Sequence, residues 1–147
     1  MCAEAALIRP AGEDDLAAIG RMLDAFNREY DEPTPGPERI AARLGELLAG
    51  AGPDGLALLR FRLSLWGGGL ECHLAELYVV PPLRGKGIGR ALLDGAMTLA
   101  RERGADHMDL GTSEDDAPAR ALYESAGFTN RERPPDGPVM YVYERSL

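Results

Sequence analysis

Residues 81–93, PPLRGKGIGRALL, decide how this chain is interpreted. They join an apolar, strand-like run that ends in two prolines to a helix-like run that begins at Ile88. Gly85, Gly87 and Gly89 lie between the two runs, and a backbone without Cβ atoms can approach a ligand closely. The N–H groups of a first helical turn have no acceptor within the helix and favour an anion. The turn therefore predicts an anion site, with phosphate as the usual occupant.

Three cations, Arg84, Lys86 and Arg90, crowd the same turn. The whole chain carries 16 Lys plus Arg against 24 Asp plus Glu, a formal net charge of −8. Cations at the N-terminal end of a helix are disfavoured by the helix dipole, and a bound polyanion would reverse that effect. A tight strand-to-helix connection with solvated cations is the alternative that the residues leave open.

Two common phosphate motifs do not fit this turn. The Walker A string GxxxxGK followed by Ser or Thr does not occur in the sequence. A dinucleotide fingerprint GxGxxG that starts at Gly85 would need glycine where Arg90 stands. The sequence therefore favours neither ATP or GTP nor NAD as the ligand.

Composition and charge limit the class of protein that this sequence can encode. The 147 residues, 45% apolar and 27% charged, predict a single globular domain over residues 1–147. The net negative charge argues against a nucleic-acid or anionic-membrane binder. No apolar stretch is long enough to span a bilayer, and residues 1–7 lack a secretory signal, so we expect a cytoplasmic protein. Cys2 and Cys72 form neither a disulfide framework nor a zinc pattern, and no metal is expected.

Hydrophobic periodicity predicts a mixed α/β order of elements. Apolar residues at helical spacing, such as Leu16, Ile19 and Leu23, mark the first helix, and Ile40, Leu44, Leu47 and Leu48 mark a second that ends at Gly50. Two long apolar runs, at 56–65 and 70–80, predict a β-hairpin. The remaining elements are listed by range: strands at 5–9, 56–65, 70–80, 107–111, 128–131 and 139–143, a turn at 51–55, and helices at 88–103 and 117–126.

Two segments together resemble the GCN5-related N-acetyltransferases (GNAT). RGKGIG at 84–89 resembles the R/Q-x-x-G-x-G/A motif, and ELYVVP at 76–81 looks like the strand that leads into it. ARALYESAGF at 119–128 is similar to the later A-x-x-L-Y-x-x-x-G-F element. The resemblance covers roughly residues 70–143. It implies a mixed, mostly antiparallel central sheet flanked by about four helices.

The resemblance also implies acetyl-CoA as the donor of an acetyl group to an amine. Residues 84–90 would wrap the CoA pyrophosphate, and Val79 and Val80 would pair with the pantetheine arm like an extra strand. Pro81 and Pro82 fit this picture, because a residue without N–H cannot continue a ladder. The implied donor-binding residues are Leu77, Tyr78, Val79, Val80, Arg84, Gly85, Lys86, Gly87, Ile88, Gly89, Arg90, Asp116, Ala119 and Tyr123.

The chemistry needs a base for the amine, a donor for the oxyanion and an acid for the thiolate. Tyr123 matches the family's general acid by position; a tyrosine that merely packs is the alternative. Glu76 is our candidate base, because burial within LAELYVV would raise its pKa; a solvated sheet face is the alternative. The N–H of Val79 or Val80 is the candidate oxyanion donor. His73 and Glu71 are weaker candidates for the base.

The sequence departs from the family pattern in two places. Asp116 stands where the family often has Asn, so it would either contact the pantetheine or only cap a helix. The five residues AGPDG between Gly50 and Leu56 are too few for a strand and a turn. We therefore expect the second strand of the family's sheet to be shortened or absent.

The acceptor is expected opposite the donor, near the loop between the first two helices and the C-terminal hairpin. Its candidate residues are Asn27, Glu29, Tyr30, Asp31, Glu32, Trp66 and Tyr141. A small-molecule amine is the favoured acceptor; a protein N-terminus or lysine and a non-catalytic acetyl-CoA-binding module are the alternatives. Phe61, Leu63, Leu65 and Trp66 would serve either a homodimer or the core.

Overall fold

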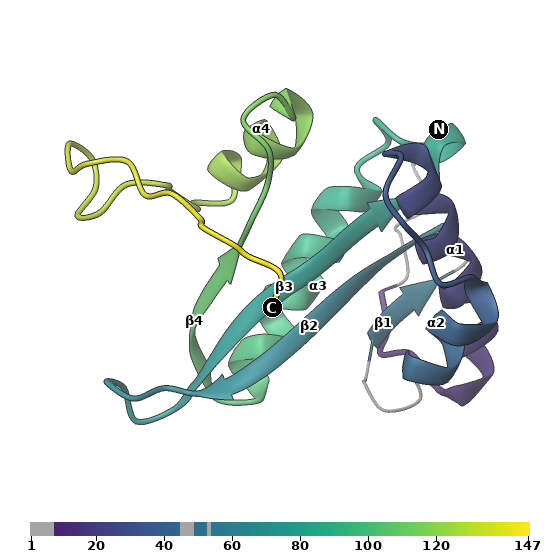
Figure 1. The fold of residues 1–147 in the computed structure, drawn as a ribbon. Helices are drawn as coiled ribbons and strands as arrows, with labels where there is room; N and C mark the ends of the chain where they lie inside the picture. The colour runs from purple at the N-terminus through teal and green to yellow at the C-terminus, as the bar shows by residue number, and fades with distance from the viewer. Residues whose placement is uncertain (1–7, 45–48, 53) are drawn as a thin grey trace, which may run out of the picture. The chain divides into compact units, whose positions relative to one another are not determined.

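The computed structural model describes residues 8–44, 49–52 and 54–147. The chain divides into two compact units, residues 1–110 and 111–147. The first unit contains η1 (Glu13–Asp15), α1 (Leu16–Glu29), α2 (Pro37–Leu44), β1 (Ala49–Gly52), β2 (Gly55–Leu63), β3 (Leu70–Val79), η2 (Pro81–Leu83), α3 (Ile88–Glu102) and β4 (Ala105–Leu110) (Figure 1). The second unit contains α4 (Ala117–Ser125).

The described strands form one mixed sheet in the order β1-β2-β3-β4. β2 pairs antiparallel with both β1 and β3, whereas β3 and β4 are parallel. A β-bulge interrupts the β2–β3 ladder, so that Leu58 faces Glu76 but Leu59 faces Leu74. The predicted α/β class, with a mostly antiparallel central sheet and flanking helices, is confirmed.

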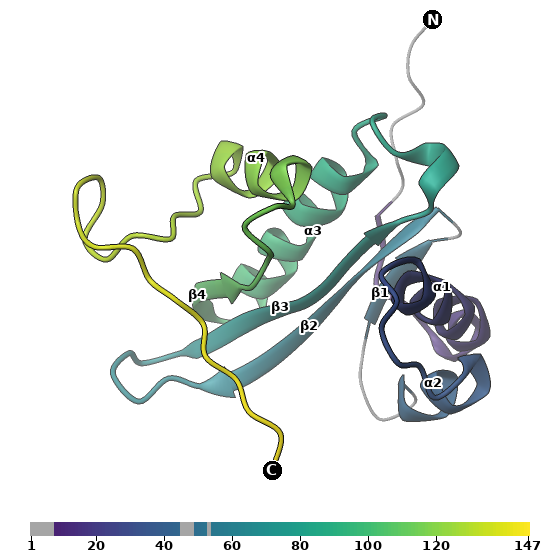
Figure 2. The same cartoon turned by 45° about the horizontal axis from the view of Figure 1, so that its top comes forward.

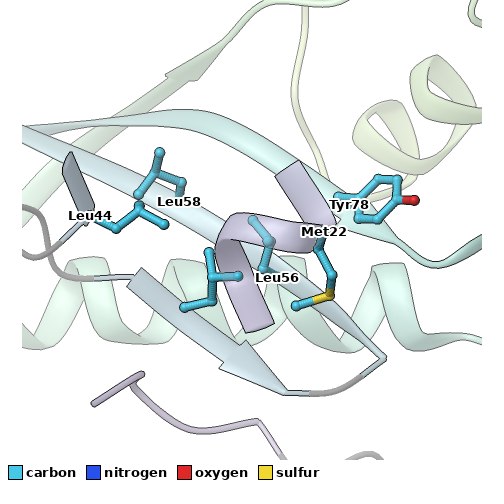
Figure 3. Packing of buried hydrophobic residues seen from close by; sticks show 6 residues of the cluster. Met22, Leu44, Leu56, Leu58 and Tyr78 are labelled. Carbon is cyan, nitrogen blue, oxygen red and sulfur yellow. The ribbon is translucent and has the colours of Figure 1, made fainter. Parts of the chain in front are cut away.

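Helices cover both faces of this sheet, as Figure 2 shows for α1 and α2 on one side and α3 on the other. Leu56 and Leu58 of β2 point to the first side, where they join Tyr78 and side chains of α1 and α2 in a buried cluster (Figure 3). The alternate residues of β2 face α3: a Cβ on Gly55 would lie 3.0 Å from Leu92. The period of two along β2 thus divides the core between the two layers.

The second strand is present and short, as the first of the two expected alternatives has it. Its position is the correction: the sequence predicts a helix end at residues 49 and 50 and a turn at 51–55, yet Ala49–Gly52 pairs with β2 from Ala49↔Leu58 to Gly52↔Gly55. Only two residues separate the paired ends, so the turn needs fewer residues than expected. An all-Ala/Gly strand also carries no alternation of polarity that would mark it. Leu47 and Leu48 lie outside the described residues.

The two predicted C-terminal strands are wrong in this structure. Residues 128–131 and 139–143 share one bridge, between Arg131 and Val139. A two-stranded ribbon of short strands is only marginally stable by itself, so the pairing does not extend beyond this bridge. The predicted strand at 5–9 lies partly outside the described residues, and Ile8 and Arg9 belong to no strand.

The other elements match their predicted ranges to within two or three residues. The helix expected at 88–103 is Ile88–Glu102, and the hairpin expected at 56–65 and 70–80 is Gly55–Leu63 and Leu70–Val79. None of the helices in the described part of the chain is both long and apolar enough to cross a membrane.

Truncation of Leu56 tests the division of the core. Its side chain is fully buried between β2, β3 and the α1–α2 layer. We expect Leu56→Ala to lower the free energy of unfolding by about 3 kcal/mol, because it removes buried methyl groups and leaves a cavity. Leu63→Ala, at an 80% exposed position on the same strand, is the control and should change stability by less than about 0.5 kcal/mol. Urea denaturation measures both; equal losses would contradict the assignment of the core.

Candidate active site

The pairing between β3 and β4 ends before β3 does. It runs to Leu74↔Leu110, whereas β3 continues to Val79. Figure 2 shows β4 stopping well short of the far end of β3. Within the described ranges, no strand pairs with this edge of residues 75–79. Unpaired N–H and C=O groups on a strand edge are a template for an extended ligand.

The alternation of an antiparallel ladder decides which groups face that edge. The N–H of Val80 donates to the carbonyl oxygen of Asp54 at 3.0 Å, so Val80 points toward β2. The backbone N–H and C=O groups of Tyr78 and Glu76, which alternate in step with Val80, also face β2. Those of Leu77 and Val79 face the open edge. Of the two candidate oxyanion donors, Val80 is therefore already engaged, and Val79 is the one that faces the edge.

The glycine turn begins where this edge ends. Gly85 and Gly87 have φ angles of 74° and 83°, the left-handed region that favours glycine, and Gly87 is the N-cap of α3. A Cβ at either position would meet nothing within 4 Å, so the space in front of the turn is open. The first N–H groups of α3 have no acceptor within the helix. An open strand edge thus leads into an anion-binding helix end.

The two arginines of the turn have different carboxylate partners. Arg84 binds the carboxylate of Glu29 on α1 through Nη1 at 2.5 Å and Nη2 at 2.8 Å, and its Nε donates to the carbonyl oxygen of Val79 at 2.9 Å. Hydrogen bonding to Arg84 lowers the pKa of Glu29. Arg90 pairs with Asp94 one turn along α3, at 3.0 Å. Arg84 therefore ties α1 to the end of β3.

Lys86 differs from its two neighbours. It is the only lysine in the sequence. It lies exposed between the two left-handed glycines, and no carboxylate of the described residues forms an ion pair with it. An ammonium without a partner retains its full charge for an anion at the turn.

Glu76 lies half-buried on the face of β3 that also carries Tyr78. Burial raises the pKa of its carboxyl group above the ordinary 4.5, and the charges of Arg60 and His73 oppose that shift. A carboxylate with a raised pKa is a better proton acceptor near neutral pH. Glu76 is therefore a half-buried carboxyl group with a raised pKa, and not a fully solvated surface glutamate.

The second unit holds four of the candidate residues, Asp116, Ala119, Tyr123 and Tyr141. The ring of Tyr123 on α4 packs against Phe128, with centroids 6.2 Å apart and an interplanar angle of 67°. Asp116 caps α4 by accepting the N–H of Ala119 at 3.1 Å, which is the capping alternative. Tyr141 is 75% exposed.

The acceptor candidates of the first unit do not form one wall. Asn27 donates to the carbonyl oxygen of Pro33, and the ring of Tyr30 contacts Phe26, so both help to shape the end of α1. Asp31 and Glu32 are exposed beside them. Trp66 lies in the β2–β3 turn, at the opposite end of the hairpin from Tyr78, about 25–30 Å away along a strand of this length. The structure does not bring Trp66 to Tyr30.

The sequence interpretation missed a cluster of charged side chains that joins β2, β3 and β4. His73 hydrogen-bonds Asp109 of β4, and Arg62 bridges the carboxylates of Glu71 at 2.6 Å and Asp109 at 2.8 Å. The parallel register that places His73 opposite Asp109 leaves no mark in local sequence. Across the described ranges, no group of three or more His, Cys, Asp or Glu has an arrangement that would hold a metal ion.

Comparisons with known proteins agree on one family. The family described as "Acetyltransferase (GNAT) family" matches residues 20–128. A crystal structure from Arthrobacter sp. FB24, of a protein assigned as an acetyltransferase, superposes with a TM-score of 0.86 at 37% identity and covers 99% of both chains.

Two curated relatives span most of this chain. A mycothiol acetyltransferase from Clavibacter sepedonicus is 33% identical over 120 residues, which cover 78% of this chain and 39% of the relative. An aminoglycoside N(6')-acetyltransferase type 1 from Stenotrophomonas maltophilia is 28% identical over 141 residues, 90% of this chain and 92% of the relative. The chain thus spans well under half of the mycothiol relative.

Neutral substitution of Glu76 tests its environment. A pKa raised in the folded state means that the folded protein binds the proton more tightly, so wild-type stability falls as pH rises from about 4.5. Glu76→Gln removes the buried charge, and we expect it to raise the melting temperature at about pH 8 and to change it little at about pH 4.

Glu71→Gln is the matched control, because Arg62 lowers the pKa of Glu71. That carboxylate contributes stability above its ordinary pKa and loses it as pH falls through its lowered pKa, so Glu71→Gln should lower the melting temperature at about pH 8 and lower it less at about pH 4. Calorimetry at the two pH values measures both variants. If Glu76→Gln destabilises the protein at about pH 8, the buried-carboxyl assignment is wrong.

Proposed function

The chain belongs to the acetyltransferase (GNAT) family, and from this premise we propose that it transfers an acetyl group from acetyl-CoA to a primary amine of a small molecule. The observation that carries the proposal is the open edge of residues 75–79 that leads directly into the N-terminus of α3. The donor has the matching sequence of groups: a thioester, an arm with two amides, and a pyrophosphate.

The pantetheine arm takes the place of a strand beside β3. Its amides exchange hydrogen bonds with the other backbone groups of the open edge, as an added strand would, and the N–H of Val79 remains for the thioester oxygen. The pyrophosphate then lies against the glycine turn, where Gly85 and Gly87 admit it closely and the first N–H groups of α3 donate to it. Lys86 adds the charge that the helix end alone does not supply.

The reaction forms an N–C bond and breaks the C–S bond of the thioester. The N–H of Val79 donates to the thioester oxygen, and this hydrogen bond strengthens as the oxygen becomes an oxyanion. Glu76 takes one proton from the ammonium form of the acceptor, so that the nitrogen lone pair attacks. The second amine proton ends on the CoA sulfur through Tyr123, which matches the general acid of the family by its place in the sequence.

The proposed acceptor is a cationic small molecule. The relatives that span most of this chain are named for acetylation of mycothiol and of an aminoglycoside. Asp31 and Glu32 are exposed beside the end of α1, and the chain carries a net charge of −8, which favours the approach of a cationic amine. The cytoplasmic location and the single domain over residues 1–147 remain predictions.

Charge reversal at Lys86 tests the donor site. We expect Lys86→Glu to raise the Kd for acetyl-CoA by about tenfold or more, because a charge-assisted contact to phosphate becomes a repulsion. Arg101→Glu at the opposite end of α3 makes the same change in net charge about 20 Å away and should leave the Kd within about twofold. Isothermal titration with acetyl-CoA, and with ATP and NAD as controls, measures this. Equal losses in both variants would mean that only net charge matters.

The single lysine allows a second measurement on the wild-type protein. An amine-acylating reagent has two targets in this sequence, the chain's N-terminus and Lys86. Acetyl-CoA should protect Lys86, and not the N-terminus, from labelling, as read by peptide mass spectrometry. Labelling of Lys86 at the same rate with and without acetyl-CoA would contradict the placement of the pyrophosphate.

Removal of the Tyr123 hydroxyl separates chemistry from binding. We expect Tyr123→Phe to lower kcat by about a hundredfold, a usual contribution of general acid catalysis, and to leave the Kd for acetyl-CoA within about twofold. The acceptor panel consists of spermidine, L-lysine, kanamycin and a peptide with a free N-terminus, and release of the CoA thiol measures turnover. Acetylation of the peptide alone would favour a protein substrate, and donor binding without turnover on any amine would favour a binding module.

A further inference from the structure

Charged side chains cover the part of the sheet face that lies beyond the α1–α2 layer. Leu58 and Arg60 are two residues apart on β2 and so share a face; their partners on β3, Glu76 and His73, share it too. Glu76 and His73 are three residues apart in sequence, and they share a face because the bulge at Ala75 shifts the alternation of β3 by one residue. Asp109 joins the same face from β4, directly opposite His73.

Asp109 holds one nitrogen of the His73 ring. Its Oδ1 bonds His73 Nδ1, and its Oδ2 accepts from Arg62 Nη2 at 2.8 Å. An ionised carboxylate only accepts hydrogen bonds, so the proton of this contact belongs to Nδ1. In the neutral ring, Nε2 is then left with a lone pair. Asp109 thereby fixes the tautomer of His73 that can accept a further proton.

His73 is close enough to Glu76 for its charge to act on that carboxyl group, together with the charge of Arg60. The His73 and Asp109 side chains are 39% and 35% exposed, so water reaches the pair. Glu76 is half-buried on the same face, and burial raises the pKa of its carboxyl group. A base that takes a proton in every turnover must release it again to solvent. The charged and titratable groups around His73 are Arg60 and Arg62 on β2, Glu71 and Glu76 on β3, and His107 and Asp109 on β4.

We propose that His73, held by Asp109, carries the proton of the acceptor amine from Glu76 to solvent. This inference rests on the proposed acetyl transfer. The ammonium loses one proton to the Glu76 carboxylate, a water passes it to Nε2 of His73, and the imidazolium releases it to bulk water. Asp109 stabilises that imidazolium and is a positioning residue. Each turnover thus yields one amide, one CoA thiol and one proton in solution.

Imidazole rescue of His73→Ala tests the relay. With the panel amine that the wild-type protein acetylates fastest, we expect kcat to fall by about tenfold or more, since a positioned proton acceptor contributes at least that much. Free imidazole at millimolar concentration should restore part of it, and the Kd for acetyl-CoA should not change. Glu76→Gln should lose activity without rescue. Loss without rescue in His73→Ala, or kcat within about twofold of wild type, would overturn the proposal.

Asp109→Asn tests the positioning role. Its amide can donate to Nδ1 and so place the ring proton on Nε2, and we expect the pH dependence of kcat/KM to shift and kcat to fall by about tenfold or more, as wrong-tautomer variants do. Arg62→Gln is the matched control, because it breaks ion pairs to Glu71 and Asp109 and leaves the His73–Asp109 contact in place. It should retain the wild-type pH profile.

If Arg62→Gln and Asp109→Asn have the same effect on the pH profile, the cluster only pins β2, β3 and β4 together and the relay is overturned. If the wild-type protein acetylates no amine of the panel, the proposed function fails and the relay fails with it. Wild-type turnover with unaffected His73→Ala and Asp109→Asn variants overturns the relay alone.

Discussion

The early end of the β3–β4 ladder is the constraint on which the rest of the structure depends. Beyond Leu74 and Leu110, the edge of β3 carries polar backbone groups that have no strand partner among the described residues. β3, α3 and β4 form a parallel crossover, so α3 must start at the end of β3 where that edge is open. Strand edge and helix N-terminus therefore adjoin because of the topology, and the glycine turn is the connection that this closeness requires.

One bulge residue changes the character of a whole strand. On one side of Ala75, β3 contributes Tyr78 to the apolar cluster under α1 and α2; on the other, it presents His73 and Glu71 to ion pairs. With a regular period of two, His73 and Glu76 would lie on opposite faces of the sheet. The bulge lies at the point where pairing to β4 stops, and it brings two proton-binding groups to one face.

Long periodic segments and the glycine turn could be predicted from the sequence, because local spacing determines them. Ile88–Glu102 and the β2–β3 hairpin matched closely for this reason. β1 was missed because Ala49–Gly52 holds only alanine and glycine, which have no polarity pattern. The strands expected near the C-terminus are two short runs with no further strand to pair with, and they share only the Arg131–Val139 bridge.

The candidate site also has a part that local sequence predicts and a part that it does not. The strand end, the glycine turn and the helix start at 76–90 could be predicted from one contiguous stretch. The engagement of Val80 by Asp54, of Arg84 by Glu29 and of His73 by Asp109 joins residues far apart in the chain. Such contacts depend on register and helix placement, which no local pattern encodes. These long-range contacts decide which of the backbone groups and side chains named as candidates are already engaged and which face the open edge.

The placement of Trp66 determines what the protein's only tryptophan reports. At the tip of the β2–β3 hairpin the indole is 95% exposed, so its emission in the native protein is already that of a ring in water. Unfolding changes its surroundings little, and ligand binding at the far end of the hairpin leaves them as they are. Tryptophan fluorescence is consequently insensitive to both events, and circular dichroism or calorimetry is needed to follow the folding of this chain.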